Sequence, residues 1–389
     1  MNIIVGVTGS IAAYKSLDFV NDLVKKGHNV RVIMTKHATA FIQPLSFESL
    51  SKNKVYTDMF SEYISALEHI NIAKWADVLF IVPATANFIA KAANGIADDF
   101  LSTVLLAFDG PTLIAPAMNT VMYHQQTTQD NIKKLHGLGY TIVETASGRL
   151  ACGDVGEGKL AEREVLTFYF EKAIHAQSLK NKKIIVTAGP TISELDPVRY
   201  ITNRSSGKMG VAIARQAALR GASVTLICGK TPIQTPIGVH RINVNTTSEM
   251  KDELSKLFAS QDVLIMAAAP ADFRPATISE EKIKKNNNLT ISFEHNEDIL
   301  KSLSEMKKNQ IVVGFAAESQ NLLENAEKKM ISKNLDMIVA NNIKSVNTGF
   351  QSDYNEATIL LKNGNKIPFP KGLKTELADF ILNEVEKIL

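Results

Sequence analysis

The sequence predicts an α/β protein of two doubly wound, mostly parallel-sheet (Rossmann-like) domains. The first observation is a repeated opening: an apolar strand, a glycine turn and a helix occur at residues 2–26 and again at residues 183–220. The second is that short β-branched runs alternate with helical stretches after each opening, the pattern of buried parallel strands joined by crossover helices. The third is the length of 389 residues, which suits two hydrophobic cores better than one.

The composition excludes several functional classes. The formal net charge of +3 is small and dispersed, so neither nucleic acid nor a membrane surface is an expected partner. No apolar run approaches the roughly 20 residues that span a bilayer, and the first residues lack the features of a signal peptide. Two cysteines fit a reducing compartment, and CxxC and HExxH motifs are absent, so a zinc site has no support. We therefore expect a cytoplasmic protein that acts on small molecules.

The first half contains the regular alternation expected of a doubly wound sheet. Strands are predicted at Asn2–Val7, Asn29–Met34, Asp77–Val82, Thr112–Ala115 and Tyr140–Val143. Helices are predicted between them at Ile11–Lys26, Ala38–Leu50, Asn87–Ala93 and Asn119–Leu138. Ligands of such sheets bind at the carboxyl ends of the strands, so candidate site residues should follow strands.

Candidate site residues lie at the ends of three strands and just before one strand. The turn Gly6–Ser10 follows the first strand, but it lacks the GxGxxG spacing and is equally consistent with an ordinary strand–helix turn. Pro83–Asn87 and Pro116–Asn119 follow the third and fourth strands, with small side chains and one amide each, which suit a flat ring lying against backbone. His69 precedes the third strand, where a lone histidine is more often structural than catalytic.

A further cluster, Ser147–Leu160, is rich in glycine and contains Cys152. Gly153-x4-Gly158-Lys159 mimics a phosphate-binding P-loop, but Leu160 stands where a magnesium-binding hydroxyl is needed and no apolar strand leads in. We reject the P-loop. The segment is better interpreted as a mobile lid with an accessible thiol, or as a surface loop with an incidental cysteine.

Together these clusters resemble the flavoprotein cysteine decarboxylases, in particular the phosphopantothenoylcysteine decarboxylases. GSIAAYK, HI…WAD, PATANF, PxMNxxM and the LACG lid occur in the family's order over about residues 1–165, with Thr85 and Tyr123 replacing the family's usual serine and tryptophan. The resemblance implies a decarboxylase domain at residues 1–175, with His69 as a catalytic residue, Asn119 binding the substrate carboxylate and Cys152 donating a proton. It also implies FMN, which supplies the electron sink for CO2 loss, held by Gly9, Ser10, Ile11, Thr35, Pro83, Thr85, Asn87, Ser102 and Thr103.

After a polar linker, the second half repeats the alternation and adds a hairpin. Strands are predicted at Lys183–Ala188, Ser223–Cys228, Val263–Ala268, Ile311–Phe315 and Met337–Ala340. Helices are predicted at Met209–Arg220, Ser248–Phe258, Asp298–Met306 and Leu322–Asn334. The strands Ala357–Leu361 and Lys366–Phe369 flank a turn containing Asn363-Gly364, which is typical of an antiparallel hairpin.

Three features of this half could carry chemistry. Arg199, Asn203 and Arg204 lie in a loop rich in serine that could cradle an anion or acyl phosphate. Asp272 follows the third strand of this half. The basic run Lys282–Lys285 is either a solvated loop or a lysine loop that closes over a triphosphate.

These features resemble the bacterial phosphopantothenate–cysteine ligases. TAGPT, DPVRYITNRSSGKMG, EKIKK, GFAAE and KNLD match from about residue 182 to the C-terminus, although Ile192-Ser193 stands where an Arg-Glu pair is common. The resemblance implies a ligase domain at residues 182–389, with Mg2+ as a cofactor, Asn203 acting on an acyl-cytidylate and Lys282 contacting the triphosphate. It places CTP near Asp272, Lys282, Asn296, Glu297, Asp298, Ile299, Phe315, Lys329 and Lys333.

The two resemblances imply one bifunctional enzyme of coenzyme A biosynthesis. The C-terminal domain would join cysteine to 4′-phosphopantothenate, converting CTP to CMP and pyrophosphate, and the N-terminal domain would decarboxylate the product to 4′-phosphopantetheine. A homo-oligomer of decarboxylase trimers linked by ligase dimers, such as a dodecamer, is implied as well. Two other readings remain: a regulatory flavin-binding protein without turnover, and an NAD-dependent dehydrogenase, which the missing GxGxxG and the absence of an acidic residue ending the second strand disfavour.

Overall fold

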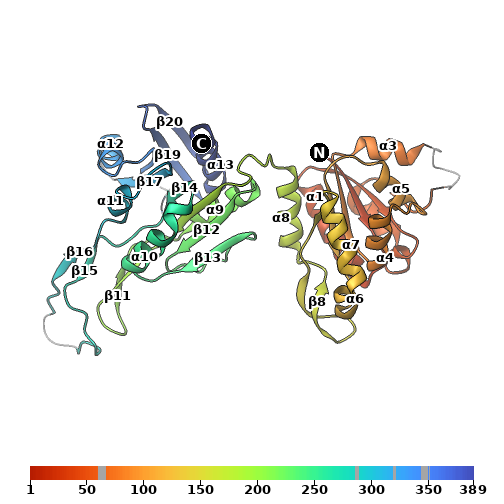
Figure 1. Ribbon diagram of the computed structural model, residues 1–389, viewed down its shortest axis with the longest axis horizontal. Helices are drawn as coiled ribbons and strands as arrows, with labels where there is room; N and C mark the ends of the chain where they lie inside the picture. Colours follow the sequence, from red (N-terminus) through yellow and green to blue (C-terminus); the bar gives the residue numbers. More distant parts are fainter. Residues whose placement is uncertain (60–66, 285–288, 319–320, 343–348, 350) are drawn as a thin grey trace. The chain divides into compact units, whose positions relative to one another are not determined.

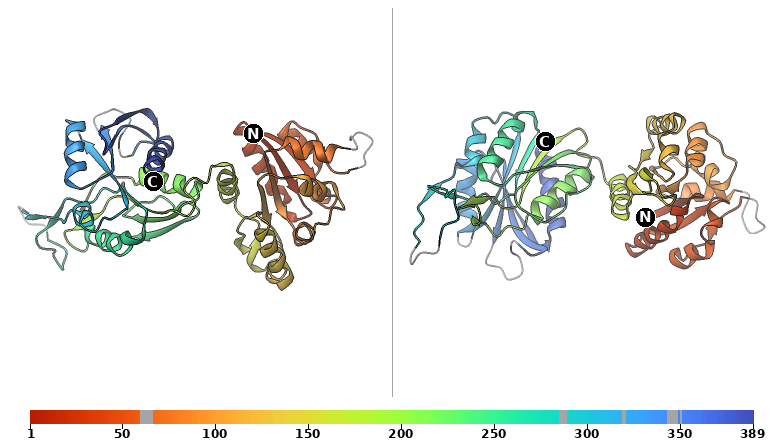
Figure 2. Two further views of the ribbon diagram at one scale, coloured as in Figure 1. Left: turned by 45° about the horizontal axis from the view of Figure 1, so that its top comes forward. Right: turned by 90° about the horizontal axis from the view of Figure 1, so that it is seen from below.

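The computed structural model describes residues 1–59, 67–284, 289–318, 321–342, 349 and 351–389. These residues divide into two compact units, Met1–His175 and Ala176–Leu389. Figures 1 and 2 show a sheet with helices packed against it in each unit, and we describe each unit by itself.

In unit 1, the described residues form a parallel sheet of six strands. Its order is β3 (Val55–Tyr56), β2 (Asn29–Met34), β1 (Asn2–Val7), β4 (Val78–Ala84), β5 (Thr112–Pro116) and β6 (Thr141–Ile142). This is the doubly wound order, whose direction of winding reverses between β1 and β4. Ligands of such sheets bind in the crevice at that point, beyond the carboxyl ends of the strands.

Helices cover both faces of this sheet because its strands are apolar on both sides. One face packs against α1 (Lys15–Lys25), α2 (Pro44–Ser51) and α8 (Arg163–Ile174). The opposite face packs against α3 (Glu68–Trp75), α4 (Ala86–Asn94), α5 (Phe100–Ala107) and α7 (Gln126–Gly137). The shorter elements are η1 (Ile11–Tyr14), η2 (Ala38–Ala40) and α6 (Thr120–His124).

The glycine-rich segment that contains Cys152 forms a β-hairpin, and Cys152 is exposed in the turn between its two strands. Strands β7 (Ala146–Arg149) and β8 (Val155–Lys159) pair in antiparallel fashion, with an irregular register between Ala146 and Gly148. No helix follows Gly158-Lys159 directly, since β8 runs to Lys159 and α8 begins at Arg163. The rejection of a P-loop is therefore confirmed.

The described part of unit 2 contains an eight-stranded sheet that repeats this winding order. It runs β13 (Val239–Asn243), β12 (Ser223–Cys228), β9 (Lys183–Ala188), β14 (Val263–Met266), β17 (Ile311–Glu318), β18 (Met337–Asn342), β19 (Tyr354–Leu361) and β20 (Lys366–Leu373). The first six strands in this order are parallel, whereas β19 and β20 are antiparallel additions at the edge. The winding reverses between β9 and β14, the counterpart of the β1–β4 position in unit 1.

Helices α10 (Thr247–Leu257), α11 (Ile299–Ser304) and α12 (Leu322–Ser332) share one core with this sheet, while α9 (Lys208–Leu219) and α13 (Lys374–Ile388) pack on each other. The short elements are η3 (Phe258–Ser260) and two small hairpins, β10 (Ile192–Glu194) with β11 (Tyr200–Thr202), and β15 (Phe273–Pro275) with β16 (Phe293–His295). Among the described residues of both units, no helix combines the length and apolar character that a bilayer crossing requires.

The predicted fold class is confirmed in both units, and the differences are local. The helix expected at Ala38–Leu50 is interrupted because Pro44, which has no backbone N–H, takes the first position of α2. The helix expected at Asn119–Leu138 is divided by the extended backbone of Gln125 into α6 and α7. Helix α5 was not predicted, because its sequence FLSTVLLA is apolar all round and has no helical period.

Arg220, the buried C-cap residue of α9, links α9 to α13 through ion pairs and hydrogen bonds. Its guanidinium donates to Glu386 at 2.7 Å, to Asp379 Oδ1 at 2.6 Å and to Asn383 Oδ1 at 2.7 Å. The Arg220 side chain is 7% exposed, whereas those of Asp379 and Glu386 are 45% and 26% exposed.

Replacing Arg220 by alanine should lower the free energy of unfolding of unit 2 by about 2–3 kcal/mol, less than the loss of a fully buried pair because the two carboxylates keep some water. Urea denaturation monitored by far-UV circular dichroism measures this change. Lys308→Ala, which removes an exposed lysine of the same unit, is the control. A change below about 0.5 kcal/mol in Arg220→Ala would show that the network adds nothing to stability.

Candidate functional site

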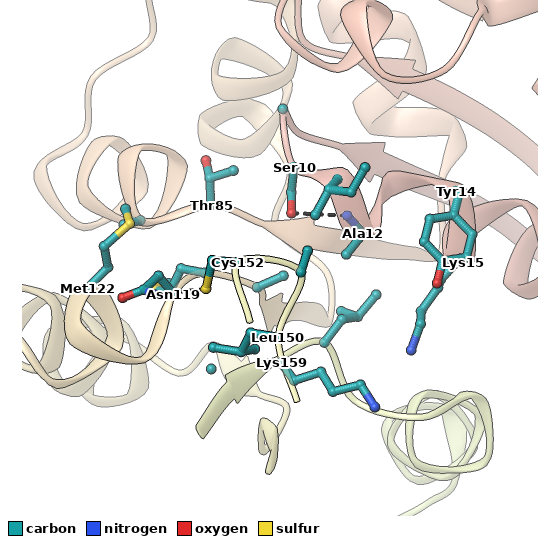
Figure 3. Close-up of a pocket in the computed structure, with 18 of the residues that line it drawn as sticks. Ser10, Ala12, Tyr14, Lys15, Thr85, Asn119, Met122, Leu150, Cys152 and Lys159 are labelled. Carbon is teal, nitrogen blue, oxygen red and sulfur yellow. Dashed lines mark hydrogen bonds between the residues drawn. The ribbon is translucent and has the colours of Figure 1, made fainter. Parts of the chain in front are cut away.

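Unit 1 contains a cavity of about 630 Å³ at the carboxyl ends of its central strands. Its lining comes from the turns after β1, β4 and β5 and from the β7–β8 hairpin (Figure 3). The predicted residues that line it are Gly9, Ser10, Ile11, Thr85, Asn119 and Cys152. The volume lies in the range of small-molecule and cofactor sites.

A buried hydroxyl joins the two turns at the switch point. Thr8 Oγ1 donates to the Pro83 carbonyl at 2.8 Å and accepts from the Thr85 backbone N–H at 3.0 Å. Next to it, a Cβ on Gly9 would lie only 2.5 Å from Cβ of His37, so any larger residue would displace the backbone. Ser10 caps η1 by accepting the Ala12 N–H at 3.2 Å. The result is a cavity wall of backbone and small side chains that a flat ligand can approach closely.

Three side chains meet at the hairpin edge of this cavity. Asn119 Nδ2 donates to Asp154 Oδ2 at 2.8 Å and to Cys152 Sγ at 3.3 Å, and the Cys152 thiol donates to Asp154 Oδ2 at 3.3 Å. Asn119 is also the N-cap of α6, where its Oδ1 accepts the Val121 N–H at 2.8 Å. Figure 3 shows the Cys152 sulfur beside the Asn119 side chain. A carboxylate binder and a proton donor predicted from separate motifs are therefore in contact.

Glycines of β8 bring the hairpin against the segment that contains Asn119. A Cβ on Gly156 would lie 2.7 Å from Thr120 Oγ1, and one on Gly158 would lie 2.7 Å from the Met118 carbonyl oxygen. The Met118 N–H donates to the Gly158 carbonyl at 2.9 Å. These glycines are thus needed for close packing and not merely for flexibility.

The other predicted residues of unit 1 lie outside the cavity lining. Ser102 is buried in a capping box with Asp99 at the start of α5, and the Thr103 hydroxyl donates to the Asp99 carbonyl at 2.8 Å. His69 is half-buried on α3. Thr35 donates its backbone N–H to the Val7 carbonyl. Pro83 is buried in β4, and Asn87 is exposed in the first turn of α4.

Unit 2 has two adjoining cavities at the equivalent position, of about 290 and 440 Å³. The smaller is lined by eight of the nine residues predicted to lie near CTP: Asp272, Asn296, Glu297, Asp298, Ile299, Phe315, Lys329 and Lys333. The larger is lined by Asn203 and shares Asp272, Phe315 and Lys329 with the smaller. The structure therefore brings Asn203 and this predicted set to one continuous crevice.

The smaller cavity carries several charged groups. Lys333 forms an ion pair with Asp298 at 2.7 Å, and Lys329 Nζ donates to the Phe315 carbonyl at 2.8 Å. Burial alone would raise the pKa of Asp298, but the Lys333 hydrogen bond, the Lys301 N–H and the nearby lysine charges outweigh it and leave the pKa lowered. Glu297 is paired with Lys251, whose hydrogen bond lowers the pKa of that carboxyl.

The larger cavity is lined by two lysines that were not predicted. Lys208, in the first turn of α9, forms an ion pair with Asp353 at 2.6 Å. Lys374 starts α13, and burial, with the charge of Lys208, lowers its pKa to about 8. Lys374 is only 7% exposed, and its Nζ donates to the Ser352 carbonyl at 2.6 Å.

A buried carboxylate connects the two loops that contain Asn203 and Lys282. Asp196 accepts from the backbone N–H groups of Val198 and Arg199 at 2.8 Å, from Arg199 Nε at 2.9 Å and from the Ile283 N–H at 3.1 Å. Arg199 Nη2 also donates to the Ile283 carbonyl at 2.9 Å. The Arg199 side chain, aided by the backbone donors, holds the pKa of Asp196 well below its usual range. Sequence reasoning missed Asp196.

Two residues of the loop that was predicted to bind an anion are hydrogen-bonded within the protein. Arg199 is engaged by Asp196 and Ile283, and Asn203 Nδ2 donates to the carbonyls of Ala269 and Pro270 at 3.1 and 3.0 Å. Lys282 is exposed and lines neither cavity, while Lys285 and the following 286–288 loop lie outside the described residues. Over the described ranges, no group of three His, Cys, Asp or Glu side chains could hold a metal ion.

Comparisons with known proteins match both halves of the chain. A family model described as "Flavoprotein" matches residues 1–175, and one described as "DNA/pantothenate metabolism flavoprotein C-terminal domain" matches residues 179–389.

The full length also matches curated proteins named "Coenzyme A biosynthesis bifunctional protein CoaBC". The chain is 44% identical to that of Bacillus subtilis over 99% of this chain and 96% of the relative, and 42% identical to that of Vibrio cholerae over 99% and 98%. A crystal structure of the C-terminal domain of such a protein covers 55% of this chain and 98% of its own, at 39% identity and a TM-score of 0.48. The chain therefore belongs to the family of bifunctional coenzyme A biosynthesis proteins, enzymes with decarboxylase and ligase activity.

Proposed function

We propose that residues 1–175 form an FMN-dependent phosphopantothenoylcysteine decarboxylase and residues 182–389 a CTP-dependent phosphopantothenate–cysteine ligase. The ligase acts first. Its product, 4′-phospho-N-pantothenoylcysteine, is the substrate of the decarboxylase, which converts it to 4′-phosphopantetheine. The observation that supports the assignment best is the contact between Asn119 and Cys152 at the cavity of unit 1, because it joins the two groups that such a decarboxylation needs.

The cavity of unit 1 suits a flavin. Gly9 leaves room against His37, and Ser10 and Thr85 bring backbone and hydroxyl groups to the same wall. FMN, when bound, supplies the electron sink that loss of CO2 from a cysteinyl carboxylate requires. The chain supplies the rest: Asn119 binds the substrate carboxylate, and Cys152 holds the proton that the product carbon receives.

In this proposal, His69 acts at the flavin site of a neighbouring copy of the chain. It lies on α3 and does not line the cavity of its own chain. In a homo-oligomer with flavin sites at subunit contacts, as in decarboxylase trimers, His69 would complete a neighbouring copy's site. We further propose that ligase units pair as dimers, that such trimers and dimers combine in a larger assembly such as a dodecamer, and that the enzyme works in the cytoplasm.

Replacing Gly9 by alanine should weaken flavin binding at least tenfold, because the new Cβ would have to displace the backbone next to His37 that forms the cavity wall. Visible absorbance of the purified protein and titration of the flavin-free form measure this effect. Gly137→Ala is the matched control, since a Cβ at Gly137 meets nothing within 4 Å. Equal flavin retention in the wild type and Gly9→Ala would contradict the placement of the cofactor.

In unit 2, we assign CTP to the smaller cavity and the acyl-transfer chemistry to the larger one. The carboxylate of 4′-phosphopantothenate attacks the α-phosphate of CTP, pyrophosphate leaves, and the amine of cysteine then displaces CMP from the acyl-cytidylate. Lys329 and Lys333 place positive charge beside the nucleotide, and Asn203 stands at the boundary with the acyl group. Lys282 neutralises negative charge on the triphosphate. Mg2+ binds as a complex with CTP, since the triphosphate oxygens themselves are ligands that this ion prefers.

One experiment tests both halves. The purified full-length protein is given 4′-phosphopantothenate, CTP, Mg2+ and cysteine, and CMP and CO2 are measured together with the visible spectrum. Yellow protein that releases both products supports the proposal. CMP without CO2 would reduce unit 1 to a flavin binder without turnover, and CO2 formed only from added 4′-phospho-N-pantothenoylcysteine would remove the ligase assignment.

A further inference from the structure

The hydroxyl of Thr191 closes a ring of hydrogen bonds at the switch point of unit 2. Its Oγ1 accepts the Ala271 N–H at 2.8 Å and lies 2.8 Å from Oγ1 of Thr247. Thr247 Oγ1 in turn donates to the Ala271 carbonyl at 3.3 Å. Since that bond uses the single hydrogen of the Thr247 hydroxyl, Thr191 is the donor in the bond between the two threonines. The ring therefore starts and ends on the backbone of Ala271.

This ring is shielded from water. Thr191 is fully buried, and Thr247 and Ala271 are buried as well. Asn296 Nδ2 also donates to the Ala271 carbonyl, at 2.8 Å. Away from water, hydrogen bonds in a chain strengthen one another, and a group that loses its partner costs more than it would at the surface. The ring therefore holds the backbone of Ala271 in one place.

The backbone of Thr191 is bonded to both loops that meet at the larger cavity. Its carbonyl accepts the Thr202 hydroxyl at 2.8 Å, and its N–H donates to the Ala269 carbonyl at 3.4 Å. The neighbour of Thr202, Asn203, donates through Nδ2 to the carbonyls of Ala269 and Pro270. Both hydrogens of this amide are thereby used on the turn formed by residues 269–272. The position of Asn203 thus depends on the position of that turn.

We propose that Thr191 is a positioning residue for the ligase reaction: its hydroxyl fixes the 269–272 turn, which carries Asp272 and holds Asn203. The inference rests on the proposed roles of Asp272 and Asn203 in unit 2. Asp272 lines both cavities and Asn203 lines the larger one, whereas Thr191 is not part of the lining of either. Thr191 therefore acts through the placement of the other two residues and not through a contact with substrate.

Unit 1 uses a threonine in the same way. Thr8, in the turn after β1, is buried, and its hydroxyl joins the Pro83 carbonyl to the Thr85 N–H at the end of β4. In each unit, a buried hydroxyl after one strand of the switch point fixes the turn after the other strand. The recurrence supports a role at the site, because ligands of such sheets bind at this point.

The test compares Thr191→Val, Thr191→Ser and Gln310→Met in the full-length protein. Valine keeps the shape of threonine but leaves the Ala271 N–H without its acceptor, so the turn has to move, whereas serine restores the hydroxyl. Gln310 is the matched control, because its buried side chain accepts the Lys308 N–H at 2.7 Å. It precedes β17 and so lies at the opposite edge of the sheet from the cavities.

The expected result is a loss of turnover that follows the hydroxyl. We expect kcat for CMP formation to fall about 10- to 100-fold in Thr191→Val, since a displacement of about 1 Å at the reacting groups can cost about 10²-fold. KM for CTP should change less than about threefold, because Lys329 and Lys333, at α12, lie outside the ring. Thr191→Ser and Gln310→Met should keep kcat within about threefold of the wild type.

Thermal unfolding followed by circular dichroism sets an assay temperature at which every variant is folded, and Thr247→Val breaks the same ring should Thr191→Val not fold. A kcat within about twofold of the wild type in the valine variant would overturn the inference. An equal loss in Gln310→Met would reduce the effect to stability, and an equal loss in Thr191→Ser would assign it to the methyl group; either result would overturn the inference too. Absence of CMP with the wild type would instead remove the ligase assignment, so the two failures are distinguishable.

Discussion

Replacing Cys152 by serine should stop 4′-phosphopantetheine formation while leaving CO2 release and the flavin spectrum in place. The thiol lies 3.3 Å from the amide that is proposed to bind the substrate carboxylate, so it is close to the carbon that must gain a proton once CO2 has left. A serine hydroxyl is a much weaker acid, and loss of a positioned proton donor typically costs on the order of 10²–10⁴ in rate. The variant should therefore accumulate an unsaturated, decarboxylated species.

Mass spectrometry of the reaction mixture and a CO2 assay measure the two outcomes separately. Ligase activity in the same chain is an internal control, because CMP formation depends on unit 2 and should be unchanged. Asp130→Asn, an exposed carboxylate on α7 that contacts Gln126, is a matched surface control. Product at the normal rate in Cys152→Ser would show that another group donates the proton.

The winding of both sheets could be predicted from the sequence because it depends on local patterns. Strands β1, β2, β9 and β12 have the predicted bounds, since each is a continuous apolar run that ends in a turn. The turns that follow β1, β4 and β5 meet at the carboxyl edge of the first sheet, which is why Gly9, Thr85 and Asn119 line one cavity.

The residues that organise the sites could not be predicted, because their partners are distant in the chain. Asp154 and Asn119 are 35 positions apart, and Asp196 and Ile283 are 87 positions apart. Such contacts depend on the register of small hairpins, such as the pairing of Ile192 with Thr202, which no periodicity in the sequence reveals. Asp154 was therefore not among the residues predicted to form a site.

Replacing Lys282 by methionine should reduce CMP formation on the order of 10²–10³-fold, the usual cost of removing a charge that stabilises a transferring phosphoryl group. Release of CO2 from added 4′-phospho-N-pantothenoylcysteine should not change, because that reaction uses unit 1. Steady-state assays of both products measure the contrast. Lys308→Met removes the same charge from another exposed lysine of unit 2 and should leave CMP formation within twofold of the wild type.

The structure explains how an exposed lysine outside both cavities could act at a defined position. Lys282 precedes Ile283, whose N–H is bound by Asp196 and whose carbonyl is bound by Arg199, so its backbone is tied to the loop that leads to Asn203. Because the pKa of Asp196 is lowered in the fold, this tie is complete above the unfolded-state pKa of about 3.9 and is lost as pH falls through the lower folded value. At neutral pH the anchor is therefore present in full. Asp196→Asn should then lower kcat for CMP formation, whereas an unchanged kcat would mean that Lys282 acts without this anchor.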